Sequence, residues 1–265
     1  MTPQTLLEYN DSGQPWPATV ASAEFGVLPS AYQQALAVRA LRQARGEQPR
    51  GYKIGFTNRQ IWQRYAVFAP IWGTVWNSTL QFCDGVGQVS VAGLCQPRIE
   101  PEAVFGIKAT PDPQAGLPGL MQAIEWLAPG FEIVQSHRPG WKFTAPETVA
   151  DGGLHARLLV GRRVSAKGLA SDVDAFNALL AAATVSLHRD AEAVEQGQGA
   201  NVLDSPLLAL FHFVKELRQC PGAPALQAGD VVTTGTWTDA WPVQPGQTWR
   251  ALFSSPLSPL HIDLV

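Results

Sequence analysis

The order of apolar and polar positions predicts short β-strands along most of the chain. Residues 98–107 and 131–137 have strand-like lengths and apolar content, and Gly and Pro punctuate the sequence around such segments. Side chains of a strand alternate between two faces, so each segment can bury at least one face. Strands are predicted at residues 51–56, 98–107, 131–137, 154–160, 184–187, 230–234, 248–253 and 260–264, with a loop and a short strand over 70–77.

Helical patterns interrupt these strands at residues 30–46, 58–65, 117–127, 173–182 and 205–220. The first is rich in Ala, Leu, Gln and Arg, and Ser30 with Gln33 can form a capping box at its start. Ser205 can cap the last helix, which has Pro206 at its first position.

Runs of strands with occasional helices predict an α+β fold, with a large mixed sheet that curls around itself and helices at its edge. We expect an N-terminal helical region, residues 1–75, packed on a mixed-sheet domain, residues 76–265, the two forming one compact unit. A chain of 265 residues with 46% hydrophobic content is long enough to bury such a core.

Charge and cysteine content exclude several classes of protein. The chain has 19 Lys and Arg residues against 22 Asp and Glu residues, and it lacks a basic run, so we expect no nucleic-acid partner. It also lacks an apolar stretch of about 18 residues, and we expect neither secretion nor membrane spanning. Three widely spaced cysteines fit neither a disulfide framework nor a paired thiolate zinc site. We interpret them as reduced thiols of a cytoplasmic protein.

Two glutamates stand out in the segment Arg98-Ile99-Glu100-Pro101-Glu102. In an extended strand Glu100 and Glu102 project from the same face, beside Arg98. Two carboxylates this close repel each other unless a cation or a proton neutralises them, so the pattern favours a metal site. The alternative is a solvent-exposed strand face with two ordinary glutamates.

A third carboxylate, Glu132, lies in an otherwise apolar strand, where a charged residue is costly to bury without a partner. Carboxylates are hard oxygen ligands, which suit Mg²⁺ or Mn²⁺ rather than zinc or copper. A site of Glu100, Glu102 and Glu132 would therefore bind one of these two ions. On these residues alone, the interpretation as an ordinary strand face stays open.

Lys53 lies in a strand-like apolar setting between Gly51 and Gly55. It can supply positive charge to an anionic substrate, or a proton if burial lowers its pKa. The alternative is a lysine that extends into solvent from a sheet edge.

Two further groups are candidates for substrate contact. Thr234 and Gly235 end a predicted strand, and their hydroxyl and N–H groups can hold a carboxylate. His155 follows a Gly-rich loop and can reach a cleft. A hydroxyl-rich strand end and a packed histidine are the simpler interpretations.

In order and spacing, these segments resemble the 2-keto-4-pentenoate hydratase and 4-oxalocrotonate decarboxylase family, within the fumarylacetoacetate hydrolase-like superfamily. The resemblance covers nearly the whole chain. Each short segment is weak evidence, but their order strengthens the three-carboxylate site. The segments are Gly51-Tyr52-Lys53-Ile54-Gly55-Phe56-Thr57, Pro97-Arg98-Ile99-Glu100-Pro101-Glu102, Phe131-Glu132-Ile133-Val134, Thr148-Val149-Ala150-Asp151 and Gly229-Asp230-Val231-Val232-Thr233-Thr234-Gly235.

The resemblance implies a partly barrel-like sheet, a Mg²⁺ or Mn²⁺ ion on the three glutamates, homo-oligomeric assembly, and Lys53 as the active-site lysine. In related enzymes the ion binds the 2-oxo or enol oxygen and the adjacent carboxylate of a small 2-oxo or 2-hydroxydienoic acid. Three carboxylates outweigh a divalent ion by one charge, so Lys53 and Arg98 are expected to compensate the charge of the substrate.

This chain departs from the family at two places. Family hydratases usually carry an acidic residue near Asn77, and an amide cannot act as a carboxylate base. Family members tend to read Asp-Asn-Ala/Ser-Ser where this chain reads Asp151-Gly152-Gly153-Leu154-His155. We therefore expect a rebuilt substrate wall, with Asn77 at the catalytic position, Asp151 and Trp76 contacting substrate, and His155 supplying the missing acid or base.

We expect a hydratase, a metal-dependent hydro-lyase of aromatic catabolism that adds water to a 2-hydroxydienoate and yields a 4-hydroxy-2-oxo acid. The alternatives are a 2-oxo acid decarboxylase of the 4-oxalocrotonate type, an acylpyruvate-type C–C hydrolase, and a non-catalytic ligand-binding member. Trp72 and Trp76 suggest an apolar substrate tail, and Arg59 and Arg64 are expected to face solvent. Such a pocket favours a monocarboxylic substrate.

Overall fold

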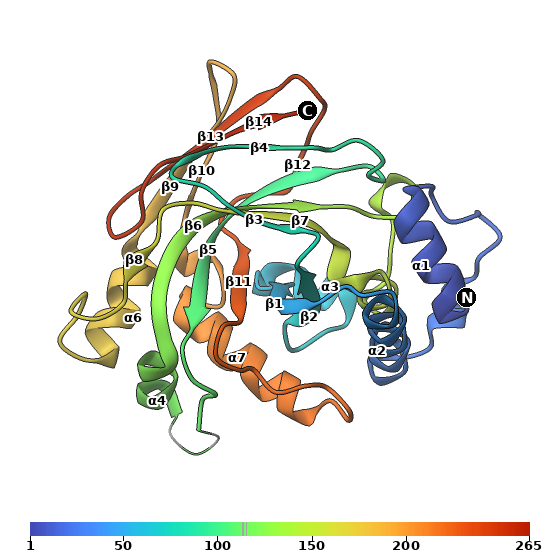
Figure 1. Ribbon diagram of the computed structural model, residues 1–265, viewed down its shortest axis with the longest axis horizontal. Coiled ribbons are helices and arrows are strands. Elements are labelled where there is room, and N and C mark those ends of the chain that lie inside the picture. The colour runs from blue at the N-terminus through green and yellow to red at the C-terminus, as the bar shows by residue number, and fades with distance from the viewer. Residues whose placement is uncertain (113, 115) are drawn as a thin grey trace.

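Two β-sheets dominate the computed structural model, which describes residues 1–112, 114 and 116–265 (Figure 1). In these residues the larger sheet has nine strands, seven of them in the order β2, β1, β11, β5, β6, β7 and β3, with β12 beside β5 and β8 beside β6. Their bounds are β1 (Pro49–Gly55), β2 (Ile71–Trp76), β3 (Leu80–Phe82), β5 (Arg98–Ile107), β6 (Ile124–Val134), β7 (His155–Val160), β8 (Val164–Ser165), β11 (Val231–Thr236) and β12 (Trp241–Pro242).

The smaller sheet packs across the larger one. Its five strands, counted in the described residues, follow the order β10, β9, β13, β14 and β4. Their bounds are β4 (Val86–Val89), β9 (Thr184–Arg189), β10 (Glu192–Gln198), β13 (Thr248–Phe253) and β14 (Leu260–Leu264).

Helices lie around the edges of the large sheet. The two N-terminal helices occupy one end of the molecule, and α4 and α6 lie toward the other (Figure 1). The α-helices are α1 (Pro3–Ser12), α2 (Leu28–Ala44), α3 (Trp62–Tyr65), α4 (Gly116–Ala123), α5 (Ala145–Ala150), α6 (Val173–Ala182) and α7 (Pro206–Gln219). Short 3-10 helices are η1 (Ser22–Phe25), η2 (Arg59–Ile61), η3 (Pro139–Trp141), η4 (Gly152–Leu154) and η5 (Gly199–Asn201).

The bounds predicted for β5, β13, β14 and α6 are confirmed. The prediction of one helix over 117–127 was wrong, because α4 ends at Ala123 and the next residue begins β6. Residues 124–127 pair with β5, and this tertiary pairing overrides their helical pattern. The capping box was also wrong, since α2 begins two residues before Ser30.

The N-terminal residues contribute strands as well as helices. α1, α2 and α5 share an apolar cluster around Trp16 and Phe25. β1 and β2, however, are integral strands of the large sheet, and the expected boundary between residues 75 and 76 falls inside β2. The strand that carries Lys53 is therefore part of the sheet that carries the three glutamates.

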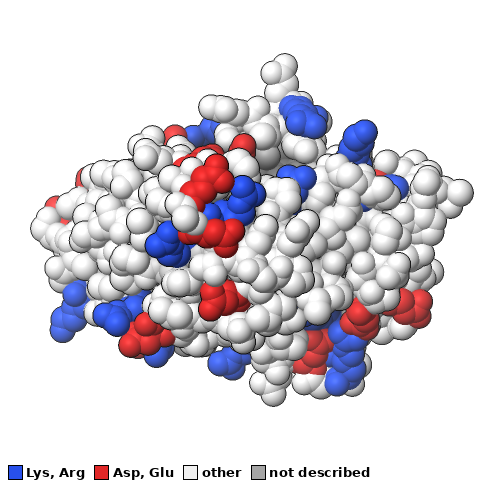
Figure 2. Space-filling model, turned by 90° about the horizontal axis from the view of Figure 1, so that it is seen from above, with Lys and Arg blue, Asp and Glu red and all other residues white. Residues whose placement is uncertain are grey.

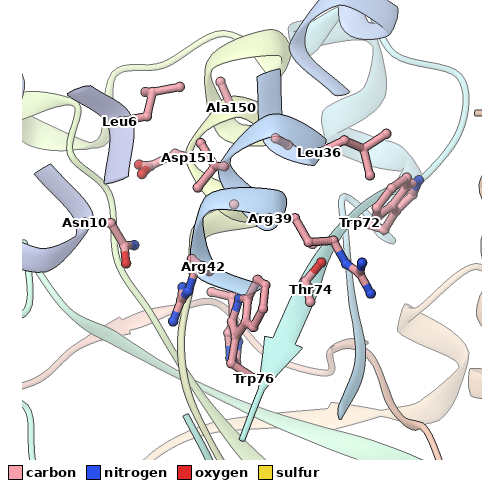
Figure 3. A pocket seen from close by; sticks show the side chains of 15 residues that line it. Leu6, Asn10, Leu36, Arg39, Arg42, Trp72, Thr74, Trp76, Ala150 and Asp151 are labelled. Atoms are coloured by element: carbon pink, nitrogen blue, oxygen red, sulfur yellow. The ribbon is translucent and has the colours of Figure 1, made fainter. Parts of the chain in front are cut away.

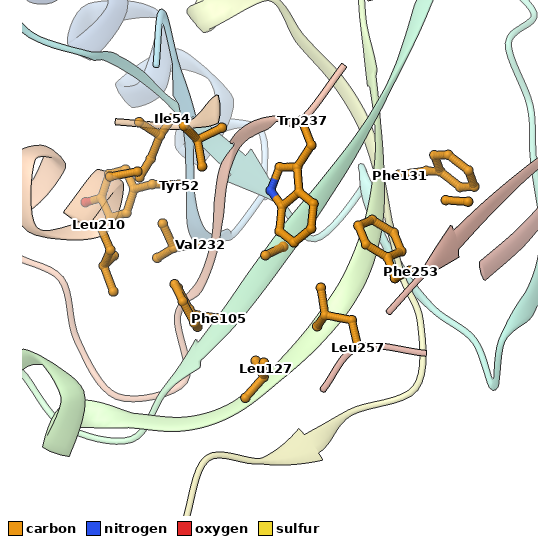
Figure 4. Packing of buried hydrophobic residues seen from close by; sticks show 14 of the residues in the cluster. Tyr52, Ile54, Phe105, Leu127, Phe131, Leu210, Val232, Trp237, Phe253 and Leu257 are labelled. Carbon is orange, nitrogen blue, oxygen red and sulfur yellow. The ribbon is translucent and has the colours of Figure 1, made fainter. Parts of the chain in front are cut away.

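Alternation along β5 separates the core from the candidate site. Ile99, Ala103 and Phe105 enter the main core together with Phe131 of β6 and Phe253 of β13. Figure 4 shows these aromatic rings near Trp237, whose ring centroid is 5.2 Å from that of Phe253 in an edge-on arrangement. The alternate positions of β5 project from its other face. The packed core thereby fixes the direction of the carboxylates.

The helices of the described residues lack the hydropathy of a membrane span, and the face shown in Figure 2 lacks a basic patch. Within the described residues, every helix is too short or too polar to cross a membrane. On the face shown in Figure 2, basic and acidic side chains are interspersed among wide uncharged areas. This distribution fits the formal net charge of −3.

Candidate functional site

Three glutamates meet where β5 pairs with β6. Glu100 lies directly opposite Glu132 in the antiparallel register, and Glu102 follows two residues later on the same face. One carboxylate oxygen from each residue lies within 4.8 Å of the others. The sheet register therefore gathers the three carboxylates that the sequence singled out.

The electrostatics of this cluster are unfavourable without a cation. Glu102 and Glu132 are fully buried. Burial and the neighbouring carboxylates hold the pKa of Glu102 well above its ordinary value. Burial, with a further contribution from Glu132, raises the pKa of Glu100 to about 7. Burial also acts to raise the pKa of Glu132, but Lys53 and His155 outweigh it and lower that pKa.

An unpaired oxygen supports the fit of the cluster to a divalent ion. Oε1 of Glu102 is buried and accepts no hydrogen bond, whereas Oε2 of Glu132 is buried and paired with the ammonium group of Lys53. A buried carboxylate oxygen without a donor is costly, whereas Mg²⁺ and Mn²⁺ prefer such oxygen ligands. The other oxygen of Glu102 accepts a hydrogen bond from the backbone N of Gly235 at 2.7 Å, so Oε1 is left free.

Lys53 joins this cluster from β1. Its Nζ lies 3.1 Å from Oε2 of Glu132, and the side chain is buried. Burial lowers the pKa of Lys53, but the three glutamates outweigh burial, and the pKa is raised overall. The hypothesis of a lysine with a lowered pKa is therefore corrected, because this ammonium group is stabilised in its charged form.

A large cavity of about 600 Å³ opens beside the cluster. Lys53, Arg98, Glu100 and Gly235 line it. Arg64 also lines it and is exposed to solvent, as the sequence predicted. The cavity thus contains positive groups from three separate segments and reaches the glutamate cluster through Glu100.

An aromatic wall covers one side of the cavity. We define it as Phe56, Tyr65, Phe143 and Trp141. Successive ring centroids are 4.8, 5.7 and 5.8 Å apart. The guanidinium of Arg98 lies 4.2 Å from the centroid of the Trp141 ring, a cation–π contact. Sequence reasoning missed this wall, because its members come from segments far apart in the chain and share no motif.

His155 does not line this cavity. Its Nδ1 lies 2.8 Å from Oε1 of Glu132, and its Nε2 lies 2.7 Å from the hydroxyl of Thr79. His155 therefore lies behind Glu132, and its role as an acid or base facing substrate stays a prediction. Burial lowers its pKa, even though Glu132 acts in the opposite direction.

Asn77, Trp76 and Asp151 also lie elsewhere. Asn77 is exposed in a turn, where its Oδ1 accepts a hydrogen bond from the backbone N of Gln48 at 2.8 Å. Asp151 accepts a hydrogen bond from the backbone N of His137 at 3.0 Å. Figure 3 shows Trp76 and Asp151 in a different, small pocket beside α1 and α2, with a volume of about 50 Å³. The large cavity is therefore not lined by these three residues, and the catalytic position of Asn77 and the substrate contacts of Trp76 and Asp151 stay predictions.

The proposed carboxylate cradle on β11 is occupied by the protein itself. The hydroxyl of Thr234 donates to the backbone O of Ala103 at 2.9 Å and is fully buried. Gly235 does line the cavity, but its N–H donates to Glu102 rather than standing free. Gly235 therefore orients a candidate metal ligand, and direct contact of Thr234 or Gly235 with substrate stays a prediction.

Replacing Gly235 by alanine is expected to destabilise the protein more than the same change at Gly246. Both residues have positive φ, 97° and 86°, so each change costs about 1–2 kcal/mol of backbone strain. A Cβ at Gly235 would also lie 2.1 Å from Oγ1 of Thr57, whereas one at Gly246 meets nothing within 4 Å. Urea unfolding of both variants measures the difference, and equal losses would contradict this steric argument.

Comparison with models of known protein families found no match. Among curated proteins, the chain is 30% identical to the 2-hydroxyhexa-2,4-dienoate hydratase of Comamonas testosteroni, over 82% of this chain and 78% of that protein. It is 29% identical to a 4-oxalocrotonate decarboxylase of Pseudomonas sp, over 93% of this chain and 91% of that protein. It is 32% identical to 2-keto-4-pentenoate hydratase 1 of Dechloromonas aromatica, over 72% of this chain and 69% of that protein.

Solved structures confirm the predicted α+β fold class. The 4-oxalocrotonate decarboxylase from Pseudomonas putida G7, complexed with magnesium and adipate, superposes with a TM-score of 0.86 at 24% identity, over 99% of this chain and 95% of that one. Fumarylpyruvate hydrolase from Pseudomonas aeruginosa, in complex with Mn²⁺ and pyruvate, superposes with a TM-score of 0.57 at 15% identity, over 82% of this chain and 89% of that one.

Proposed function

Because this chain belongs to the 2-keto-4-pentenoate hydratase and 4-oxalocrotonate decarboxylase family, we propose that it is a divalent-metal-dependent hydratase. It adds water to a 2-hydroxydienoate and yields a 4-hydroxy-2-oxo acid. The observation that carries the proposal is the cluster of three buried or partly buried glutamates beside a cavity that also exposes Lys53. The relatives named as hydratases support the reaction type.

Glu100, Glu102 and Glu132 would hold Mg²⁺ or Mn²⁺ through their carboxylate oxygens. When bound, such an ion supplies positive charge that stabilises negative charge on the 2-oxo or enol oxygen of the substrate. Glu100 and Lys53 also line the cavity, so they place this charge within reach of a bound acid. Gly235 keeps Glu102 oriented through its N–H group.

Lys53 holds positive charge where an anionic substrate needs it. The three carboxylates outweigh a divalent ion by one charge, so an incoming carboxylate is repelled unless another cation compensates. Lys53 is buried and stabilised in the ammonium form, and it can hold or donate a proton at Nζ. Arg98 adds a second positive group on the cavity wall.

The aromatic wall supports an apolar distal group on the substrate. Its four rings line the cavity and can cover a hydrocarbon chain while excluding water. Trp72 and Trp76, which the sequence assigned to this task, do not line the cavity. The inference of an apolar substrate tail therefore rests on different residues.

A 4-oxalocrotonate-type decarboxylase is the second candidate, because Arg64 and Arg98 both line the cavity. Two guanidinium groups can seat a second substrate carboxylate, which a decarboxylase of this type requires. Arg64 is exposed to solvent, as the sequence predicted, but it also lines the cavity, so positive charge for a second carboxylate is present there. The relative named as a decarboxylase spans most of this chain and supports the same alternative.

The expected assay result is hydration of 2-hydroxypenta-2,4-dienoate and little release of carbon dioxide from 4-oxalocrotonate. Both compounds are incubated with the Mg²⁺-loaded protein, and dienoate absorbance, the 4-hydroxy product and carbon dioxide are measured. A chelator-treated sample is the control, because the reaction needs the ion. Rapid release of carbon dioxide without hydration would assign the protein to the decarboxylases, and metal binding without either reaction would indicate a ligand-binding protein.

Homo-oligomeric assembly in the cytoplasm completes the proposal. Phe68, Phe82 and Val86 expose 84%, 50% and 63% of their surface, and contact with a second copy of the chain would remove such apolar area from water. Cys83, Cys95 and Cys220 are all free thiols, as expected in a reducing compartment.

A further inference from the structure

His155 forms a bridge between Glu132 and the turn before β3. On one side its Nδ1 lies 2.8 Å from Oε1 of Glu132, and on the other its Nε2 lies 2.7 Å from Oγ1 of Thr79. All three residues are buried. The ring therefore connects a candidate metal ligand to a fixed part of the backbone, on the side of Glu132 away from the cavity.

The direction of the hydrogen bonds fixes the imidazole. An ionised carboxylate can only accept, so Nδ1 of His155 carries a hydrogen and donates it to Glu132. In the neutral ring Nε2 is then an acceptor. The hydroxyl of Thr79 has one hydrogen and lies 2.7 Å from Nε2 but 3.2 Å from the backbone O of Trp76, so the shorter contact favours donation to Nε2. The hydroxyl of Thr79 also accepts a hydrogen bond from the backbone N of Trp76 at 3.1 Å, which holds Thr79 itself in place.

Glu132 needs this donor to present its other oxygen correctly. Oε2 lies in the cluster, 3.1 Å from Nζ of Lys53, while Oε1 points toward His155. With both oxygens engaged, rotation of the carboxylate would break at least one buried interaction. Loss of the imidazole would leave Oε1 buried without a donor, which favours rotation or protonation of the ligand.

The backbone before His155 is built for this placement. Gly152, Gly153 and Leu154 all have positive φ, 66°, 70° and 67°. The backbone of Leu154 is sterically strained in this conformation, because Leu154 has a side chain and the two glycines do not. A Cβ on Gly73 of β2 would lie 2.0 Å from the backbone O of Gly152, so this glycine lets the loop approach the sheet. These are the positions at which the chain departs from the family motif.

We propose that His155 is a positioning residue: it fixes the third carboxylate ligand, Glu132, through a Thr79–His155–Glu132 hydrogen-bond chain. This inference rests on the proposed metal-dependent function. It assigns His155 a role that replaces the expected acid or base, and it does not require His155 to touch substrate. Partners that orient metal ligands typically contribute about 10–100-fold in metal affinity.

Calorimetric titration with Mn²⁺ tests this role without relying on activity. His155→Leu is expected to weaken Mn²⁺ binding by about 10–100-fold, because Leu cannot donate to Glu132. His155→Asn is the matched variant, since its side-chain amide can place an N–H near the position of Nδ1. It is expected to recover most of the affinity. Thr79→Val keeps the side-chain volume but removes the hydroxyl, and it is expected to cause a smaller loss than His155→Leu.

The outcomes separate this inference from the proposed function. Absence of Mn²⁺ binding in the unaltered protein would contradict the metal site itself. Normal binding in both His155→Leu and Thr79→Val would leave the site intact and overturn the positioning role. Equal weakening in His155→Leu and His155→Asn would assign the effect to packing rather than to the donated hydrogen bond. If His155→Leu does not fold, as judged by circular dichroism, the loss in Thr79→Val and its absence in His155→Asn decide the question.

Discussion

Replacing Glu102 by glutamine is expected to weaken Mg²⁺ binding by more than about a hundredfold, beyond the effect of losing an outer partner. The backbone N–H of Gly235 donates to one oxygen of Glu102 at 2.7 Å. The amide oxygen of glutamine will keep this bond, and its NH₂ group will then stand where the unpaired Oε1 stood. An NH₂ group has hydrogens to donate and cannot bind a cation. Isothermal titration calorimetry measures the loss.

Stability measurements provide the control for this variant. The pKa of Glu102 is raised, so its ionised form opposes folding at neutral pH in the metal-free protein. Glu102→Gln should therefore be at least as stable as the unaltered protein without metal, but it should lose the stabilisation that added Mg²⁺ gives. Glu125→Gln changes the same charge at an exposed position on β6 and should retain that stabilisation. Unchanged Mg²⁺ affinity in Glu102→Gln would rule out its role as a ligand.

Replacing Lys53 by methionine is expected to reduce kcat/KM by about 10²–10⁴-fold while leaving Mg²⁺ binding intact. The ammonium group of Lys53 lies 3.1 Å from Oε2 of Glu132, so its positive charge repels an approaching cation. Removing it should therefore maintain or increase metal affinity. The same change removes the positive charge that an anionic substrate meets in the cavity. Steady-state kinetics and calorimetry on one preparation measure both effects.

Two companion variants define what Lys53 contributes. Lys53→Arg keeps a positive charge but holds its protons firmly, so it should recover binding of an anion such as pyruvate more than it recovers turnover. Lys108→Met removes a positive charge from an exposed position and should behave like the unaltered protein. Near-normal turnover of Lys53→Met would show that this lysine serves only to balance buried charge.

The alternation of side chains along the predicted strands was the most informative feature of the sequence for predicting the site. Successive side chains of a strand point to opposite faces, so alternation along β5 predicts that the two glutamates, Glu100 and Glu102, share one face. In the structure Ile99 and Phe105 enter the core from the other face. Placing Glu132 beside them depends on the β5–β6 register. The long apolar segment around Glu132 suggested a strand but did not reveal its register. Resemblance to known sequences supplied that missing information.

Side-chain directions outside regular strands could not be predicted in the same way. His155 follows three residues with positive φ, and Leu154 is a side-chain-bearing residue for which this conformation is rare. No local pattern predicts such a turn, so the side of Glu132 on which His155 lies could not be deduced from the residues alone. Arg64, Trp141 and Phe143 line the same cavity only because segments far apart in the chain fold together. The periodicity of a single segment cannot predict which distant segments will lie side by side.

Completion of the site during synthesis of the chain depends on β11. β5 and β6 follow each other along the chain and pair directly, so the three glutamates meet through contacts that are comparatively close in sequence. β1 reaches β5 through β11, whose residues Val231–Thr236 are synthesised well after those of β5 and β6. The three glutamates can thus come together before Lys53 is held against them, because contacts distant in sequence form slowly. The nascent chain therefore gathers its carboxylates before it gains the positive charge that accompanies them.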